Sequence, residues 1–281
     1  MKRQKRVAAI HDISCFGRCS LTVALPIISA AGIECSVIPT ALLSTHTGGI
    51  TGYTFLDLTD EILPIASHWQ SLGLEFDGLY SGFLGSFEQI DVVSEVFDRF
   101  RSADNLIVVD PVMADNGVLY KVFPPTFPSG MRKLCAKADV IIPNITEATL
   151  LLDEPYLEGP YTQSYIEGIL ERLSKLGPKQ VILTGVYFKG DHLGAASYDA
   201  RTGEVSYAFD RLIEGYYHGT GDVFGSALVA SLISGKSLAE STSIAVDFTV
   251  KSILRTKAAG TDIRFGVNFE AGLRELAEKL A

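Results

Sequence analysis

The sequence predicts an α/β fold with a mostly parallel central sheet, and three observations support this prediction. Short apolar runs that are poor in charge recur along the first two thirds of the 281-residue chain, as expected of strands that are buried on both faces. Longer amphipathic segments separate these runs, and strands that alternate with helices form βαβ units. The composition is 47% hydrophobic and 20% charged, which suits a large core. Because no linker-like composition shift divides the sequence, we expect a single domain over residues 1–281.

The elements are expected in the following order along the chain. The predicted strands are 6–10, 35–38, 78–80, 106–109, 140–142 and 180–183. The predicted helices between them are 20–30, 87–101, 129–136, 146–152 and 162–176. Thr162 is a suitable N-cap for the last of these, and Gly177-Pro178 is a typical stop. A hairpin of 192–199 and 204–210 should follow, and then helices at 222–234, 238–257 and 269–280.

The charge and the cysteine content indicate which binding partners and which cellular compartment to expect. The chain has 24 Lys and Arg against 33 Asp and Glu, a net charge of −9, which argues against nucleic acid or an anionic membrane as partner. Four cysteines in so long a chain do not form a disulfide framework and fit a reducing compartment. The basic start, Met1 to Arg6, precedes an apolar run that is too short for a signal peptide, and no run is long enough to span a membrane. We therefore expect a cytoplasmic protein.

The predicted strands end in unusually polar segments. In open α/β sheets, ligands bind beyond the carboxyl ends of the strands, so the chemistry is expected there. The segments are 14–17, 44–49, 81–86, 110–117, 144–147 and 184–185.

The most informative motif is His218-Gly-Thr-Gly-Asp222, which directly precedes an apolar helix. Its glycines allow a ligand to approach the backbone, and the free N–H groups of the helix start favour an anion such as a phosphate. The helix start should also keep Asp222 ionised at neutral pH, as a base requires. The alternative interpretation is an ordinary glycine turn with Asp222 as a helix cap. The motif lacks the lysine of a Walker A loop, so a P-loop enzyme is not expected.

Three motifs occur in an order that resembles the ribokinase-like small-molecule kinases. They are Gly219-Thr-Gly-Asp222, the segment Asp-Pro-Val-Met-Ala-Asp-Asn-Gly at 110–117, and Pro-Asn-Ile-Thr-Glu at 143–147. The Asp-Pro-Val-Met segment, Ser14 near the first strand end, and Thr-His-Thr-Gly at 45–48 are together most similar to the vitamin B6 kinases. The resemblance implies a three-layer αβα sandwich and transfer of the ATP γ-phosphoryl group, with Mg²⁺, to the 5′-hydroxymethyl group of pyridoxal, pyridoxine or pyridoxamine. It also implies a homodimer, and it leaves the need for a monovalent cation open.

The resemblance assigns catalysis to the glycine motif. It makes Asp222 the general base and the amides of Gly219, Thr220 and Gly221 the anion hole. Physically, Asp222 would deprotonate the alcohol while the amides offset charge on the transferring group.

Five further polar residues are assigned by the resemblance to the nucleotide and metal. Asp110 and Asp115 would lie near the metal and phosphates, Asn144 and Thr184 would contact the nucleotide, and Glu147 would order metal-bound water. Mg²⁺ keeps several waters, so contacts from Asp115 and Glu147 can be indirect. A purely structural interpretation also exists, because Asn144 and Glu147 form nearly a capping box and Asp110 precedes a proline.

The vitamin is assigned to four residues by the same resemblance. Ser14 and Thr47 would hydrogen-bond the polar edge of the pyridine ring, while His46 and Phe83 would supply apolar or stacking walls. Two positions depart from the family pattern: Thr45 replaces a frequent Asn, and Phe83 replaces a Tyr. The preferred vitamer therefore stays open, as do the roles of Cys15 and His218.

Two alternatives compete with a B6 kinase. Hydroxymethylpyrimidine kinase of thiamin synthesis acts on a similar heteroaromatic hydroxymethyl compound, but such enzymes often carry Cys where Asp222 stands. A non-catalytic vitamer sensor on the same fold would need no base.

Overall fold

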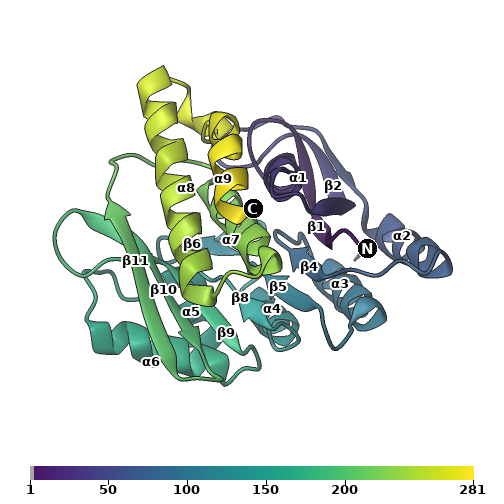
Figure 1. The fold of residues 1–281 in the computed structure, drawn as a ribbon, viewed down its shortest axis with the longest axis horizontal. Coiled ribbons are helices and arrows are strands. Elements are labelled where there is room, and N and C mark those ends of the chain that lie inside the picture. Colours follow the sequence, from purple (N-terminus) through teal and green to yellow (C-terminus); the bar gives the residue numbers. More distant parts are fainter. Residues whose placement is uncertain (1–2) are drawn as a thin grey trace.

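The computed structural model describes residues 3–281, so Met1 and Lys2 of the basic start lie outside the described part. Its main feature is a nine-stranded sheet in the order β11-β10-β9-β8-β5-β4-β1-β2-β3 (Figure 1). The strands are β1 (Arg6–Phe16), β2 (Glu34–Thr45), β3 (Phe55–Asp57), β4 (Gly78–Ser81), β5 (Leu106–Val109), β8 (Val140–Ile141), β9 (Gln180–Val186), β10 (His192–Asp199) and β11 (Glu204–Arg211). The neighbours from β2 to β9 pair in parallel, and the pairs β2–β3, β9–β10 and β10–β11 are antiparallel. This confirms the predicted α/β fold.

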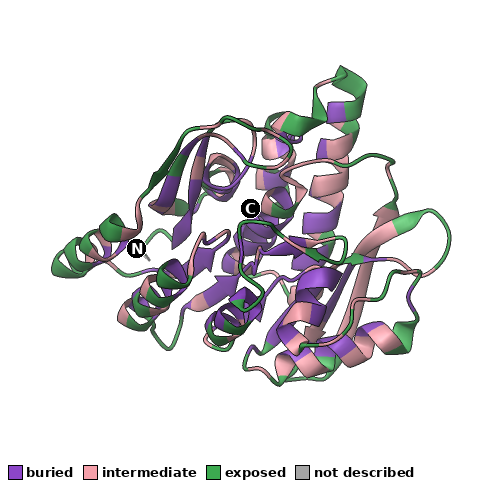
Figure 2. Cartoon of the chain, turned by 180° about the vertical axis from the view of Figure 1, so that it is seen from behind, coloured by how far each residue is buried: buried purple, intermediate pink, exposed green. Residues whose placement is uncertain are grey.

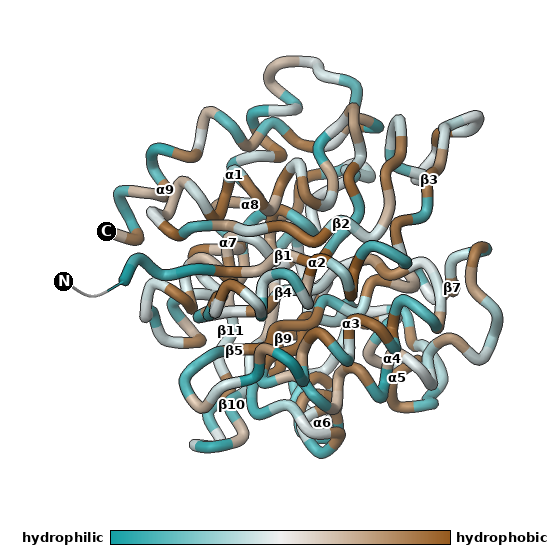
Figure 3. Tube along the Cα trace, turned by 90° about the vertical axis from the view of Figure 1, so that its right-hand side faces the viewer, coloured by the Kyte–Doolittle hydropathy of each residue, from teal (hydrophilic) through white to brown (hydrophobic). Residues whose placement is uncertain are grey.

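Helices cover both faces of the sheet. One face packs against α1 (Leu21–Ala30), α7 (Thr220–Ser234), α8 (Leu238–Ala259) and α9 (Leu273–Leu280). The other face packs against α2 (Thr59–Ser71), α3 (Phe87–Phe100), α4 (Phe127–Cys135), α5 (Ile145–Leu152) and α6 (Gln163–Ser174). The side view in Figure 3 separates the two helical layers, and Figure 2 shows the buried strands between them. The molecule is thus a three-layer αβα sandwich.

The central strands read as continuous apolar runs because each of their faces has its own core. In β1 the side chains of Ala8 and Ile10 join the core under α2–α6, whereas Val7 and Ala9 join the core under α7–α9. All four are at most 1% exposed.

Several element boundaries differ from the prediction. The first strand continues to Phe16 and the second to Thr45, with a register shift between His11 and Ile13, so Ser14 lies inside a strand and not in a turn. The C-terminal helix expected over 269–280 starts as a 3₁₀ turn, Glu270–Gly272, before α9.

One α-helix and three strands were not predicted. They are α2, which contains Pro64, the exposed edge strand β3, and the small hairpin of β6 (Ala114–Asp115) and β7 (Val118–Leu119). Of the helices in residues 3–281, none combines the length and apolarity needed to cross a bilayer.

Candidate active site

The glycine motif forms a tight turn into α7. Gly219 adopts a left-handed conformation with φ 72°, and a Cβ atom there would lie 2.1 Å from the carbonyl oxygen of Arg18. Only glycine fits this position, for conformational and for steric reasons. Gly221 is different, because a Cβ atom built there meets no atom within 4 Å. The loop is therefore fixed on one side by the chain at Arg18 and open on the other.

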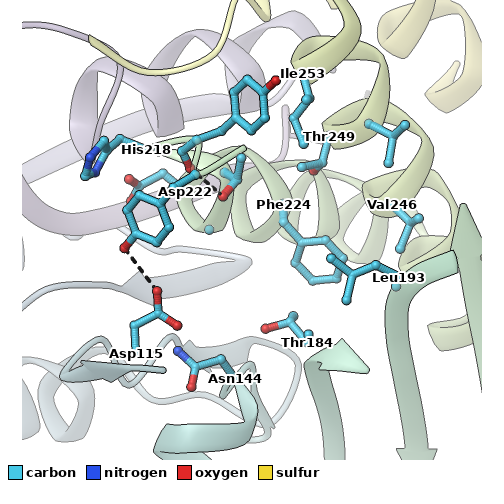
Figure 4. Close-up of a pocket in the computed structure, with 18 of the residues that line it drawn as sticks. Asp115, Asn144, Thr184, Leu193, His218, Asp222, Phe224, Val246, Thr249 and Ile253 are labelled. Atoms are coloured by element: carbon cyan, nitrogen blue, oxygen red, sulfur yellow. Dashed lines mark hydrogen bonds between the residues drawn. The ribbon is translucent and has the colours of Figure 1, made fainter. Parts of the chain in front are cut away.

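The open side of the loop faces a cavity of about 520 Å³. The residues of the motif line it together with the five residues that were assigned to nucleotide and metal: Asp110, Asp115, Asn144, Glu147 and Thr184. Figure 4 shows Asp115 and Asn144 across the cavity from Asp222. The carboxyl ends of the parallel strands bring these distant segments together, as expected for an open α/β sheet.

An apolar wall completes the cavity and was not found from the sequence. It consists of Leu193 on β10, Phe224 on α7, and Val246 and Ile253 on α8 (Figure 4). The positions on α8 belong to a long helix whose apolar residues are equally consistent with core packing, so the sequence carried no signal for them.

Asp222 has a higher pKa than the sequence suggested. Asp222 is half-buried at the edge of the cavity, and desolvation of its carboxylate raises its pKa to about 7; the nearby charge of Asp12 acts in the same direction. The nearby backbone of Ser20 offsets this rise in the pKa only in part. The expectation that the helix start keeps this pKa low was wrong, because the cost of desolvating the charge exceeds the effect of the helix dipole.

Asn144 and Glu147 form the capping box that the sequence suggested. The Asn144 side chain accepts from the Glu147 N–H at 2.9 Å, and the Asn144 N–H donates to Glu147 Oε2 at 2.9 Å. Glu147 Oε1 also accepts from the N–H of Met113 at 3.0 Å. The structural interpretation therefore holds, and both side chains border the cavity as well.

The carboxyl groups at this end of the cavity disfavour one another's ionised form. Burial and the charge of Glu147 raise the pKa of Asp110 well above its usual range, and burial raises that of Glu147 to about 8. A bound cation would relieve this repulsion, and carboxylate oxygens suit Mg²⁺. Across residues 3–281, no three His, Cys, Asp or Glu side chains form a ready-made metal cluster. The residues thus fit a Mg²⁺ that is held largely through water and phosphate.

The four residues assigned to the vitamin do not line this cavity. Ser14 is fully buried, and its hydroxyl donates to Asp12 Oδ2 at 3.3 Å. His46 is 8% exposed and hydrogen-bonds the Arg264 carbonyl, Thr47 is exposed, and the ring of Phe83 packs against Phe123 with 5.6 Å between centroids.

His218 connects the two regions. It lines the cavity, and its ring lies 5.0 Å from that of His46 and 5.0 Å from that of Tyr216. The Tyr216 hydroxyl in turn donates to Asp115 Oδ2 at 3.0 Å. This row of side chains runs from Asp115 at the cavity to His46, the residue before Thr47. Cys15 is exposed and does not line the cavity.

Two polar residues beside Asp222 were missed from the sequence. Asp12 is 5% exposed, and Ser20 donates its hydroxyl to Asp12 Oδ1 at 2.6 Å. Little in the sequence indicated a role for Asp12, because a single carboxylate after the apolar run Val7–Ile10 is typical of an ordinary strand end.

The fold and the glycine loop define a class of phosphotransferases, and comparison with known proteins identifies the family. The model of the phosphomethylpyrimidine kinase family matches residues 25–266, so the chain belongs to this family. Relatives of the chain include kinases named for B6 vitamers and kinases named for hydroxymethylpyrimidine. This confirms the kinase resemblance that the motifs indicated.

Two solved structures are similar over almost the whole chain. One, from Bacteroides thetaiotaomicron, is named a phosphomethylpyrimidine kinase and was crystallised with pyridoxal; it is 40% identical, with a TM-score of 0.92 over 98% of this chain and 96% of that one. The other is pyridoxal kinase from Lactobacillus plantarum, which is 32% identical, with a TM-score of 0.90 over 99% and 98% of the two chains.

Among curated relatives, the thiamine biosynthetic bifunctional enzyme TH1 of Arabidopsis thaliana is 25% identical over 80% of this chain. The chain spans only 42% of that enzyme's length and 40% of the rice counterpart's. The pyridoxine/pyridoxal/pyridoxamine kinase of Bordetella avium is 25% identical over 90% of this chain and 86% of its own.

Proposed function

We propose that the chain transfers the ATP γ-phosphoryl group, with Mg²⁺, to the 5′-hydroxymethyl group of a B6 vitamer. The observation that carries this proposal is the pairing of Asp222, whose pKa is about 7, with an open loop of backbone amides at the same cavity. A base and an anion site side by side are what phosphoryl transfer to an alcohol requires.

Asp222 acts as the general base in this proposal. A base is most effective when its pKa lies near the operating pH, because it is then both ionised and able to hold the proton. Burial raises the pKa of Asp222 into this range. Its carboxylate would orient the hydroxymethyl group and take its proton as the oxygen attacks phosphorus.

The amides of Gly219, Thr220 and Gly221 form the anion hole. They stand at the start of α7, a 15-residue helix, whose dipole and free N–H groups favour negative charge. The absence of any atom near the Gly221 Cβ position leaves room for a phosphoryl group to approach the backbone. The N–H groups would stabilise charge on the transferring group without moving.

The opposite part of the cavity suits the nucleotide. The apolar wall that includes Leu193, Val246 and Ile253 can pack against a flat base, while Asn144 and Thr184 offer polar contacts to sugar or phosphate. Asp115 and Glu147 would hold Mg²⁺ through water. When bound, Mg²⁺ would neutralise charge on the phosphates.

The choice of a B6 vitamer is supported by the two similar structures, one crystallised with pyridoxal and one named pyridoxal kinase. Ser14 and Thr47 are proposed to contact the vitamin ring, with His46 and Phe83 as walls. Phosphorylation of hydroxymethylpyrimidine is the second candidate, because the matching family and the plant relatives are named for thiamin-related chemistry.

A coupled assay of ADP formation can decide between these substrates. The panel contains pyridoxal, pyridoxine, pyridoxamine and hydroxymethylpyrimidine, each with MgATP, and Asp222→Asn serves as the control for contaminating kinases. We expect at least one vitamer to exceed hydroxymethylpyrimidine in kcat/KM by about tenfold or more, the discrimination given by about 1.4 kcal/mol in the transition state. A preference for hydroxymethylpyrimidine would reverse the substrate assignment. Pyridoxal binding without turnover of any compound would instead indicate a sensor.

A further inference from the structure

Two side chains from distant segments of the chain meet at the cavity. Tyr216 lies in the loop between β11 and α7, Asp115 lies on β6, and both line the cavity. The Tyr216 hydroxyl donates to Asp115 Oδ2 at 3.0 Å, and Figure 4 shows this bond as a dashed line to Asp115. The bond therefore joins the loop that leads into the glycine motif to the hairpin that carries a carboxylate proposed for the metal.

The main chain of Asp115 is held by the turn that follows it. Asn116 and Gly117 have φ values of 49° and 76°, as in the two-residue turns that match the twist of a hairpin, and Asp115 pairs with Val118 across this turn. The Gly117 N–H donates to Thr146 Oγ1 on α5 at 2.9 Å. The hairpin thus fixes the position of the Asp115 backbone, but it does not by itself fix the rotation of the carboxylate.

The carboxylate of Asp115 is oriented by one hydrogen bond to each oxygen. Oδ1 accepts from the N–H of Asn116 at 2.9 Å, and Oδ2 accepts from the hydroxyl of Tyr216. The first bond comes from the adjacent residue, whereas the second comes from a different loop. An ionised carboxylate has about four acceptor positions, so both oxygens keep lone pairs for water that surrounds a bound Mg²⁺.

The loop holds Tyr216 in place from the other side. Gly215 has φ 130°, and a Cβ atom there would lie 2.8 Å from the ring of Tyr217, so this turn requires glycine. The Tyr217 carbonyl accepts from the hydroxyl of Thr220, the first residue of α7, at 3.1 Å. The ring of Tyr216 packs edge to face against that of His218, with 5.0 Å between centroids. The Tyr216 hydroxyl is therefore presented by a loop that is tied to the start of α7.

We propose that Tyr216 is a positioning residue for the metal site: its hydroxyl holds the Asp115 carboxylate in the orientation that accepts hydrogen bonds from water around Mg²⁺. This inference rests on the proposed metal role of Asp115 and extends it to a residue that does not touch the metal. Through this bond, the loop that forms the proposed anion hole also sets the orientation of a carboxylate on the opposite side of the phosphates.

The ring of Tyr216 offers an alternative role. The residue is 54% exposed, so its ring could stack on a ligand without any contribution from the hydroxyl. Two substitutions separate these roles, because Tyr216→Phe removes the hydroxyl and keeps the ring, whereas Tyr216→Ala removes both. The proposal predicts that Tyr216→Phe shows most of the defect of Tyr216→Ala. A defect in Tyr216→Ala alone would overturn it in favour of stacking.

The affinity for ADP, measured by isothermal titration calorimetry with Mg²⁺ and with EDTA, tests the proposal without turnover. With Mg²⁺, the Kd of Tyr216→Phe should be about fivefold that of the wild type, a modest effect because water can replace a half-exposed hydroxyl. With EDTA, the two Kd values should agree within about twofold, since Asp115 acts through the metal. An unchanged Kd with Mg²⁺, or the same loss in both conditions, would overturn the proposal.

A double-mutant cycle tests whether Tyr216 acts through Asp115. In Asp115→Ala the Tyr216 hydroxyl has lost its acceptor, so adding Tyr216→Phe should change the Kd for ADP with Mg²⁺ by less than about twofold. Independent effects that multiply would overturn the proposal. If Asp115→Ala leaves the Mg²⁺-dependent part of the affinity unchanged, the metal role of Asp115 and the positioning role fail together, whereas the proposed phosphoryl transfer with Asp222 as base does not.

Tyr207 provides a matched control. Its hydroxyl also donates to a carboxylate at 3.0 Å, Glu167 Oε1, but this pair joins β11 to α6 and is not among the residues that line the cavity. Tyr207→Phe removes the same kind of bond and should leave the Kd for ADP unchanged with Mg²⁺ and with EDTA. A defect equal to that of Tyr216→Phe would show a general loss of stability and would overturn the proposal.

Steady-state kinetics separate positioning from a direct part in the chemistry. In Tyr216→Phe the Mg²⁺ concentration for half-maximal activity should rise about fivefold, while kcat at saturating Mg²⁺ stays within about threefold of the wild type, because excess metal fills the site. A large fall in kcat with an unchanged Mg²⁺ dependence would overturn the positioning role. The calorimetric result would support that role even if no B6 vitamer were a substrate, so the two proposals can fail separately.

Discussion

The ionised carboxylate of Asp222 should destabilise the folded state, so Asp222→Asn should have a higher free energy of unfolding than the wild type. Burial raises the pKa of this carboxyl from 3.8 to about 7, so between these values the folded state holds a proton that the unfolded chain has lost. Wild-type stability must then fall as the pH rises through this range. The Asn variant lacks the titrating group and should lack this part of the pH dependence.

The size of the effect follows from the two pKa values. The difference of about three pH units corresponds to an upper limit of about 4 kcal/mol, at 1.36 kcal/mol per unit. The carboxylate borders the cavity, where solvent screens its charge, so we expect about half of this, ~2 kcal/mol. The gain in the free energy of unfolding should be near zero at about pH 4 and complete above about pH 7.5.

Urea unfolding across this pH range measures the effect directly. Asp91→Asn removes the same formal charge from the exposed face of α3 and controls for the change in net charge. If Asp222→Asn and the wild type have parallel stability–pH curves, or if the variant is less stable at pH 8, the raised pKa and its cause are refuted.

Three further predictions concern the same cavity. Gly221→Ala should fold normally, since its Cβ meets no atom within 4 Å, but it should raise the KM for ATP about tenfold because the new methyl group obstructs the phosphate. Gly219→Ala should instead lower the melting temperature by several degrees, because its Cβ would lie 2.1 Å from a carbonyl oxygen. Equal ATP affinity in Gly221→Ala and the wild type would refute the assignment of this loop as the anion-binding site. The kcat of the wild type should fall as the pH drops below about 7, as Asp222 takes up a proton; a profile that is flat down to about pH 5 would exclude this pKa for the base. Asp115→Asn should raise the Mg²⁺ concentration for half-maximal activity about tenfold, and an unchanged Mg²⁺ dependence would exclude Asp115 from the metal site.

Much of the fold could be predicted from the sequence because the central strands are buried on both faces and therefore consist of short apolar runs. The elements that were missed lack this signal. The edge strand Phe55–Asp57 is exposed throughout, and α2 contains Pro64, which argues against a helix interior. The ends of β1 and β2 were placed too early because both strands continue beyond their apolar runs into polar residues.

The parts of the candidate site that were predicted consist of residues that lie close together in the sequence. The glycine motif and the Asn144–Glu147 pair each form within a few residues, and both border the cavity. The raised pKa of Asp222 was not predictable, because it depends on burial and on Asp12, which is distant in sequence. The hydrogen bond between Ser20 and Asp12 was missed for the same reason, because the two side chains meet only in the folded chain.

The central claim is that Asp222 is the general base, and the turnover number of Asp222→Asn tests it most directly. The substitution keeps the size and hydrogen bonding of the side chain but removes the proton acceptor. With pyridoxal and MgATP both saturating, we expect kcat to fall by roughly 10²–10⁴ while the variant remains folded and binds both substrates. Asn caps a helix about as well as Asp, so a purely structural role predicts that activity survives. A kcat within a few-fold of the wild type would contradict the account.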